Sequence, residues 1–196
     1  MDPGEGRILN FYMDRVLGGD IIVEQNIHVI DVTNWLLNGH PLKAHGVGGR
    51  SDWSGTKYDA GDAYDHFAVT YWYPNGVTCS FSSNQLTNSF SDLCVRCFGI
   101  KGCADTHYGG LVRITGENAW LGAEKDDTFR QGAINNVKAF VESIRTGKLL
   151  NNAEPAVESN LTAILGRTAA YRQATVTWDE MMASDERWQA ELKLRW

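Results

Sequence analysis

The chain has 196 residues, which is enough for one well-developed hydrophobic core. Hydrophobic residues make up 43% and charged residues 21% of the sequence, as in ordinary soluble globular proteins. The net charge of −6 argues against a nucleic acid or an anionic membrane as a partner, because neither is attracted to an acidic surface.

Hydropathy and cysteine content set the expectation for localisation. No run approaches about 18 consecutive apolar residues, so we expect no transmembrane helix. The N-terminus, MDPGEGRILNFY, lacks the features of a signal peptide and starts abruptly, as though another segment preceded it. Four cysteines imply no disulfide framework. A reducing compartment, the cytoplasm, is therefore the default, although a preceding segment could carry an export signal.

Two helical segments are predicted near the N-terminus. Residues 7–17 predict one or two helical turns that stop at a pair of glycines. The stretch GGDIIVEQNIHVIDVTNWLL, residues 18–37, then predicts one helix that begins after this pair. It ends at Asn38-Gly39, which is typical of a C-terminal cap.

The second of these helices places three ionisable side chains on one stripe. Glu24, His28 and Asp31 stand at i, i+4 and i+7, within about 60° of one another at ~100° per residue. Most of the remaining circumference is apolar, which predicts a buried helix. Two carboxylates and an imidazole on a buried helix are costly unless they are paired, ligated or used in function. This stripe is therefore the main candidate for a functional site.

The middle of the chain predicts an antiparallel meander, because its strands follow one another through short turns. The predicted strands are residues 42–48, 64–73, 77–83, 92–100, 103–108, 111–115 and 119–121. Residues 51–61 are polar and predict a loop. Pro74-Asn75-Gly76 gives the strongest hairpin signal of the chain. The strand before this hairpin has one strongly apolar face: Phe67, Val69, Tyr71 and Tyr73.

The C-terminal third predicts helices again. The apolar spacing of residues 134–144 predicts a helix closed by Gly147, and residues 152–171 predict another. Thr177 is the predicted cap of a short helix over residues 178–182. Together these patterns predict the α+β class, with helices packed on one face of an antiparallel sheet as a single pair of layers.

Two patterns are similar to ligand-binding motifs, but each has a feature that argues against it. Residues 46–49, GVGG, are followed by a polar loop and no helix, so we expect no nucleotide site there. Four residues have a spacing similar to that of a zinc site: Cys94, Cys97, Cys103 and His107. Because Cys94 and Cys97 have opposite parity on a strand, their side chains diverge. We therefore expect free thiols and no bound metal.

The strand over residues 64–73 carries a weaker candidate. Asp65 and His66 are consecutive, so they point to opposite faces and cannot both line one pocket. His66 lies on the less apolar face, where it is either a substrate contact or a surface or interface residue. Trp72 shares this face, and exposed aromatic residues on a sheet often mark partner contacts.

The stretch over residues 18–37 resembles a segment of the C-terminal domain of the Gfo/Idh/MocA oxidoreductases. In that family the segment has three glycines, a few apolar residues, Asp, three residues, His, two residues, Asp, and an apolar run that ends in Trp-Leu. The likeness continues through YDHFAVTYWYPNGV, FVESIRTGK, AILGRTAAYR and TWDE, in the same order. It covers nearly the whole chain, so residues 1–196 are expected to form a single domain of this kind.

The resemblance implies an open-faced, mainly antiparallel sheet, as in the C-terminal domain of glyceraldehyde-3-phosphate dehydrogenase-like proteins. In the family this domain closes the substrate site and mediates oligomerisation, while an N-terminal Rossmann domain binds NAD or NADP. The sequence has neither the glycine-rich fingerprint of that domain nor its Glu-Lys-Pro motif. The resemblance thus implies a carbohydrate-like substrate, a homo-oligomer through the open sheet face and a Rossmann domain as partner. The chain alone is expected to bind no cofactor tightly and not to turn over.

The family's catalytic positions fall on the stripe. His28 matches the catalytic histidine and Asp31 the aspartate that follows it, while Glu24 stands where many members have aspartate. A histidine is suited to take the proton of a sugar hydroxyl during oxidation. The spacing alone allows other interpretations. His28 could be paired in a buried structural network, and Asp31 could orient His28 or a backbone group.

Two other functional classes stay open at this point. The three stripe residues could form a facial set for iron or manganese in a metal-dependent hydrolase or lyase. The chain could also be a non-catalytic domain that oligomerises or binds through its sheet.

Overall fold

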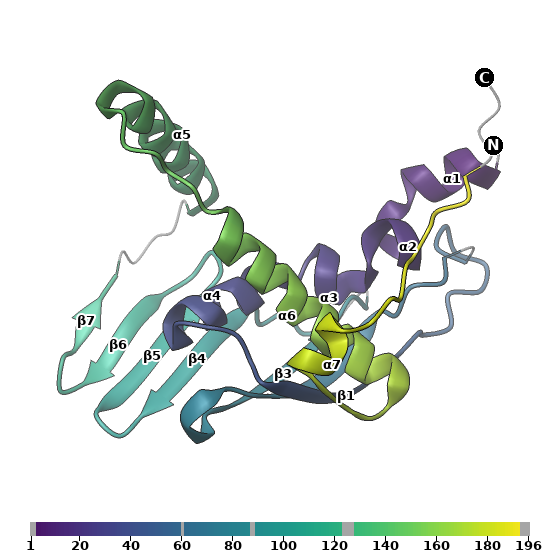
Figure 1. Cartoon of the computed structure of the whole chain (residues 1–196), viewed down its shortest axis with the longest axis horizontal. Coiled ribbons are helices and arrows are strands. Elements are labelled where there is room, and N and C mark those ends of the chain that lie inside the picture. Colours follow the sequence, from purple (N-terminus) through teal and green to yellow (C-terminus); the bar gives the residue numbers. More distant parts are fainter. Residues whose placement is uncertain (1–2, 60, 87–88, 123–127, 193–196) are drawn as a thin grey trace. The chain divides into compact units, whose positions relative to one another are not determined.

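The computed structural model describes residues 3–59, 61–86, 89–122 and 128–192 (Figure 1). It has two antiparallel sheets together with helices, which confirms the predicted α+β class. Its contacts divide the chain into two compact units, Met1–Ser89 with Val157–Trp196 and Phe90–Ala156. Each unit is described by itself.

The first unit begins with short helices. These are α1 (Pro3–Leu9), η1 (Phe11–Met13), α2 (Arg15–Gly18), α3 (Asp20–Glu24) and α4 (Ile27–Leu37). The prediction of one continuous helix over residues 18–37 is therefore wrong. The first break lies where Gly19 and Asp20 both have positive φ, of 77° and 67°. A right-handed helix cannot pass through this conformation, so α2 ends and α3 begins there.

The second break separates α3 from α4. The backbone N–H groups of Gln25 and Asn26 both donate to the carbonyl oxygen of Ile21, at 3.0 and 2.9 Å. This shared acceptor ends α3, and the carbonyl oxygen of Asn26 then accepts from Ile30 N–H at 3.2 Å to begin α4. The side chain of Asn26 makes no capping hydrogen bond to the first turn of α4. The apolar period continues across the break, which is why the sequence pattern did not reveal it.

The sheet of the first unit has the order β3-β2-β1-β8. Its strands are β1 (Lys43–Gly49), β2 (His66–Trp72), β3 (Thr78–Asn84) and β8 (Thr175–Thr177). The hairpin predicted at Pro74-Asn75-Gly76 connects β2 with β3, and all pairings are antiparallel. Strand β8 was not predicted, because three residues are too few to show a period.

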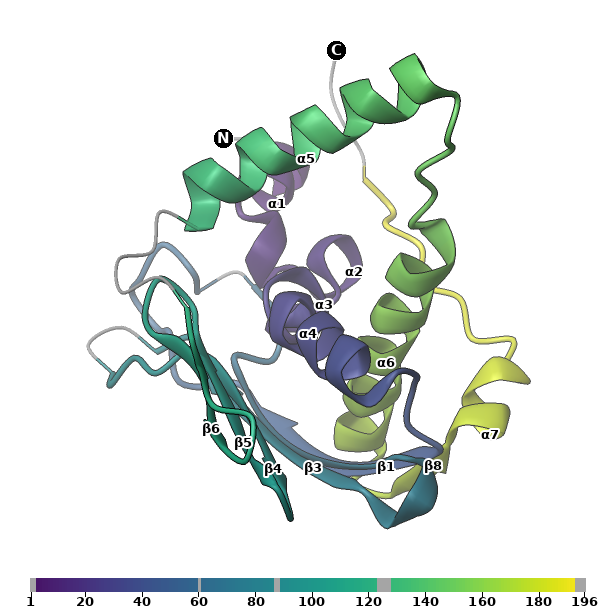
Figure 2. The same cartoon turned by 90° about the vertical axis from the view of Figure 1, so that its left-hand side faces the viewer.

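The core of the first unit lies between this sheet and the helices. The apolar face of β2 is buried as its alternation predicted, with Tyr71 only 2% exposed. Helices α3, α4 and α6 (Ala153–Arg172) lie on this side of the sheet (Figure 2). Ile21 and Ile22 of α3 and Leu165 of α6 belong to the same buried cluster. Burial of these side chains is the main stabilising contribution in this unit.

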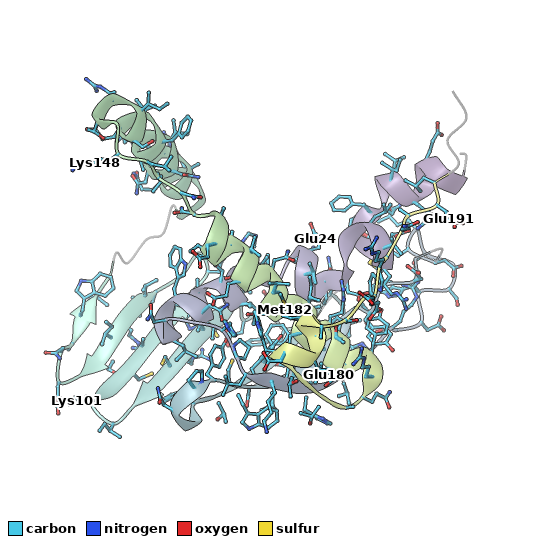
Figure 3. All side chains as sticks on the ribbon, viewed as in Figure 1. Glu24, Lys101, Lys148, Glu180, Met182 and Glu191 are labelled. Atoms are coloured by element: carbon cyan, nitrogen blue, oxygen red, sulfur yellow. The ribbon has the colours of Figure 1, made fainter. Side chains whose placement is uncertain are left out.

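The second unit contains the other sheet, of order β4-β5-β6-β7. It is formed by β4 (Cys94–Gly99), β5 (Gly102–His107), β6 (Val112–Gly116) and β7 (Trp120–Leu121), and α5 (Thr128–Thr146) follows. Lys101 lies in the tight turn between β4 and β5 (Figure 3). The sequence suggested one meander, whereas the strands are divided between two sheets. The division falls after β3, where Gln85 N–H donates to Asp65 O and so continues the pairing with β2.

The C-terminal helices agree with their predicted positions. Helix α5 is followed by Gly147, whose φ is +67°, and α6 covers the predicted stretch. The short helix α7 (Trp178–Met182) is capped by the Thr177 hydroxyl, which accepts from Glu180 N–H at 3.1 Å. Within the described ranges, no helix combines the length and apolar character needed to cross a bilayer.

The approach of α6 to β2 depends on Gly166, which gives a first prediction. A Cβ at Gly166 would collide with the hydroxyl group of Tyr71, which is itself fully buried. We expect Gly166→Ala to destabilise the protein by about 1–3 kcal/mol, although alanine is the better helix former. Urea unfolding followed by circular dichroism measures this change.

Gly132 in α5 provides the matched control. It is also a helical glycine, but a Cβ there would meet nothing within 4 Å. Gly132→Ala should therefore stabilise the helix by about 0.5–1 kcal/mol. Equal effects of the two substitutions would show that the contact with Tyr71 does not limit the packing of α6.

Candidate active site

The three stripe residues lie around the junction of α3 and α4. Glu24 is the last residue of α3 (Figure 3), His28 is the second residue of α4, and Asp31 follows about one turn later. Because the chain is interrupted between α3 and α4, Glu24 is not on the same helix as His28 and Asp31. The buried helix predicted from the apolar circumference is only partly realised: His28 is exposed, whereas Glu24 and Asp31 are half-buried.

Glu24 presents an unused acceptor. Its Oε2 atom is buried and has no hydrogen-bond partner among the described residues. Leaving a buried acceptor unsatisfied costs about 1–3 kcal/mol, more if the group is charged. Such atoms in native proteins commonly meet a ligand, water or ion.

Asp31 is held by the C-terminal helix α6. Its Oδ1 atom accepts a hydrogen bond of 2.6 Å from the hydroxyl of Ser159. In the same buried region Asn34 donates to Thr162 Oγ1 at 3.1 Å and accepts from the Tyr73 hydroxyl at 2.7 Å. This network fixes α4 against both α6 and the end of β2. Ser159, Asn34 and Thr162 were not predicted as site residues, because these partners lie far apart in the sequence.

Asp20 fixes the start of α3. Its side chain is fully buried, and Oδ1 accepts from Tyr64 N–H at 2.7 Å and from the Tyr171 hydroxyl at 3.0 Å. Its other oxygen, Oδ2, has no hydrogen-bond partner in the described part of the chain. Burial raises the pKa of Asp20 to about 6, although these hydrogen bonds and the charges of Arg167 and Arg15 oppose the shift. No sequence pattern had singled out this residue.

Two guanidinium groups lie close to Asp20. Arg167 stacks over the Trp188 ring at 3.9 Å, and Arg15 lies 4.6 Å from the centre of the same ring. Burial lowers the pKa of Arg167, while the negative charge of Asp20 acts in the opposite direction. The surroundings of Asp20 are thus cationic, which keeps its raised pKa from rising further.

His66 lies apart from the stripe. Strand β2 points its apolar face toward the helices, so His66 is exposed on the opposite face of the sheet. Its Nδ1 atom lies 2.7 Å from Oδ1 of Asp65. Burial alone would raise the pKa of Asp65, but hydrogen bonds from His66, Ser51 and Trp53 outweigh it and hold this pKa below its usual range. The structure therefore does not bring His66 together with His28.

Metal-ligating side chains gather elsewhere. Among the described residues, one group of three or more has ligand atoms within 4.8 Å of one another, and it does not include Glu24, His28 or Asp31. The geometry therefore gives no support to a facial metal set on the stripe. None of the four cysteines forms a disulfide bond.

The family model described as GFO/IDH/MocA C-terminal domain matches residues 3–105. A search among curated proteins found no match. Among solved structures, the chain is similar to aldose-aldose oxidoreductase from Caulobacter crescentus, complexed with glycerol, at 18% identity and a TM-score of 0.66, over 90% of this chain and 52% of that one. It is also similar to myo-inositol 2-dehydrogenase from Lactobacillus plantarum, at 17% identity and a TM-score of 0.64. This match covers 90% of this chain and 54% of that one.

A third similar structure is an oxidoreductase from Agrobacterium radiobacter in complex with NAD+, L-tartaric acid and magnesium. Its identity is 12% and its TM-score 0.65, over 83% of this chain and 50% of that one. At these identities the likeness to solved structures shows the fold alone. The chain spans about half the length of each of these three proteins.

The raised pKa of Asp20 predicts a pH-dependent stability. The pKa rises from an ordinary 3.8 to about 6, so the folded state binds this proton more tightly than the unfolded state. The stability gained is present below pH ~4 and lost as the pH rises through ~6. Relative to Asp20→Asn, the wild type should lose roughly 2–2.5 kcal/mol between pH 4 and pH 7. Urea unfolding of both proteins across this range measures the difference.

Asp52→Asn serves as the control for this measurement. Asp52 is exposed, and hydrogen bonds from Ser54 lower its pKa. Its contribution to the free energy of unfolding must therefore not fall as the pH rises. A constant difference between wild type and Asp20→Asn would contradict the assignment to Asp20.

Proposed function

The chain belongs to the Gfo/Idh/MocA family through the C-terminal domain of its members, and from this premise we propose that it is the substrate-binding half of an NAD(P)-dependent oxidoreductase. The substrate class that we propose is a sugar, a polyol or a related carbohydrate with an oxidisable hydroxyl group. Support comes from the similar structures, which include an inositol dehydrogenase and an aldose-aldose oxidoreductase.

The observation that carries the proposal is the setting of His28. An exposed imidazole at the start of α4 follows shortly after a glutamate whose buried oxygen has no partner in the described residues. An imidazole can accept a proton near neutral pH, and a carboxylate can accept a hydroxyl hydrogen bond. We assign His28 as the base for the substrate hydroxyl and Glu24 as the acceptor that orients it or a neighbouring hydroxyl group.

Asp31 has a different part in this proposal. Its hydrogen bond from Ser159 ties α4 to α6, and both side chains lie in the same half-buried to buried region. We therefore assign Asp31 as a positioning residue that fixes the orientation of α4, and with it the direction of His28.

The GVGG stretch does not have the geometry of a dinucleotide-binding turn. The glycines of the GVGG stretch lie within β1, where the backbone pairs with β2, and no helix follows. We propose that a Rossmann domain, either in the same polypeptide or as a partner, holds NAD or NADP. The nicotinamide supplies the hydride acceptor when it is bound there.

The outward face of the first unit's sheet is the proposed oligomer contact. It has a hollow of about 420 Å³ whose lining includes His45, Ala68 and Ser80 together with the apolar residues Val47 and Phe81. Val47 on the same face is 51% exposed. The sequence left two possibilities for His66, a substrate contact or a surface or interface residue. In this proposal His66 belongs to the outward sheet face and does not contact the substrate.

The test is turnover in a protein that contains both halves. The chain is joined behind a Gfo/Idh/MocA Rossmann domain, and NADH formation is followed at saturating cofactor with myo-inositol and with glucose. His28→Ala should lower kcat by about 10²–10⁴-fold, the usual contribution of a general base. Lys148→Ala is the control, because Lys148 is an exposed residue after α5, outside the candidate site and the proposed oligomer contact, and it should keep kcat.

Binding by the chain alone provides a second readout. Titration calorimetry with NAD+ should show no binding tighter than millimolar. If the chain alone bound NAD+ tightly, or if His28→Ala kept full turnover, the proposal would fail. The second result would favour a non-catalytic binding domain instead.

A further inference from the structure

A second cluster of reactive side chains lies in the other unit. Asp92, Cys94 and His107 each offer one ligand atom, and these atoms all lie within 4.8 Å of one another. Cys94 is directly opposite His107 in the ladder of β4 and β5. Tyr108 N–H donates to Leu93 O at 2.9 Å, so the next pair, Cys94 and His107, is a non-hydrogen-bonded pair. Side chains approach most closely in such pairs.

We propose that Asp92, Cys94 and His107 form a binding site for Zn²⁺ or a similar borderline divalent metal ion. A carboxylate, a thiolate and an imidazole are the three side-chain ligands that zinc uses in proteins. The thiolate and the carboxylate together balance the charge of a divalent ion. Harder ions such as Mg²⁺ and Ca²⁺ prefer oxygen ligands only, so the donor set selects against them.

The distances suit a tetrahedral centre. His107 Nδ1 lies 3.2 Å from Asp92 Oδ1. Two ligands bound at about 2.0 Å in a tetrahedron are separated by ~3.3 Å, so this pair already has the required spacing. Cys94 needs only a side-chain adjustment to complete the set, because all three ligand atoms start within 4.8 Å.

The outer contacts of His107 match those of a metal-bound histidine. While Nδ1 faces Asp92, the other ring nitrogen, Nε2, lies 3.1 Å from Asp105 Oδ1. A carboxylate that accepts from the second nitrogen fixes the tautomer and direction of a ligating imidazole. Asp105 is held in turn by Arg96 at 3.0 Å and Arg113 at 3.4 Å.

Arg96 is a cation that lies beside this cluster. Its Nη2 atom lies 3.1 Å from Nε2 of His107, on the side of the ring that faces Asp105. Its contact with Asp92 is longer, at 3.4 Å, than its contact with Asp105, at 3.0 Å. Arg96 contacts Oδ2 of Asp92, whereas Nδ1 of His107 faces Oδ1, so the oxygen proposed as the metal ligand is not the one that Arg96 contacts.

Two of the three ligand residues lie beside an open hollow. Asp92 and His107 line a pocket of about 400 Å³ together with Ser91 and Leu111. Three protein ligands and one open position are typical of zinc sites that bind water or a small oxygen ligand. The proposed site is therefore accessible to exchange with metal ions from solution.

The test uses the full, untagged, reduced chain after treatment with EDTA. Co²⁺ is added as a spectroscopic probe, since a thiolate ligand gives a charge-transfer band and a tetrahedral site gives intense visible bands. We expect one equivalent of Co²⁺ to saturate both signals, and one equivalent of Zn²⁺ to abolish them by displacement.

Variants assign the ligands. Cys94→Ser should remove the charge-transfer band, while Cys97→Ser, which changes a thiol on the opposite face of the same strand, should keep it. Asp105→Asn should weaken Co²⁺ binding by about 10–100-fold, as expected for a group that orients a ligand. Circular dichroism confirms that each variant is folded.

A measurement on the wild type avoids any effect of substitution on folding. Alkylation of each cysteine is followed by mass spectrometry with and without Zn²⁺. Zn²⁺ should slow the alkylation of Cys94 at least tenfold and leave that of Cys97 unchanged. Equal rates at Cys94 with and without Zn²⁺, or a charge-transfer band that persists in Cys94→Ser, would overturn the proposal.

Discussion

The packing of α6 against the inward face of β2 is the contact on which the rest of the first unit depends. Because Gly166 has no side chain, the helix backbone can lie directly on the ring of Tyr71. The other elements are then attached to these two: Tyr171 of α6 donates to Asp20 at the start of α3, and Ser159 of α6 donates to Asp31 of α4. The candidate site therefore depends on a surface that it does not itself touch.

The polar groups of the candidate site differ in how far the first unit satisfies them. Asp31 is bound to Ser159, whereas Glu24 keeps a buried oxygen without a partner in the described residues and His28 faces outward. This difference between Asp31 and Glu24 fits a domain that supplies only part of an active site. The group that sets the direction of α4 has its hydrogen-bond partner, and Glu24, one of the groups assigned to the substrate, keeps an acceptor for it.

Local patterns predicted much of the fold, and long-range contacts account for what they missed. The alternation in β2, the hairpin at Pro74-Asn75-Gly76 and the helix α6 depend on neighbours in sequence, and all are present. The break at Gln25 was invisible because the apolar period runs through it. His28 was identified by a motif, but its exposure depends on that break. The pairing of Cys94 with His107 depends on strand register, which the cysteine spacing alone cannot give.

The division of residues 18–37 into two helices has a consequence for the cooperativity of folding. Helix α3 has only five residues, which is far below the length at which a helix is stable in water by itself. It exists because Ile21 and Ile22 are buried and Asp20 is bound by Tyr64 and Tyr171. Glu24 at its end is therefore placed by the tertiary structure as a whole, and we expect α3 to fold and unfold together with the sheet, α4 and α6.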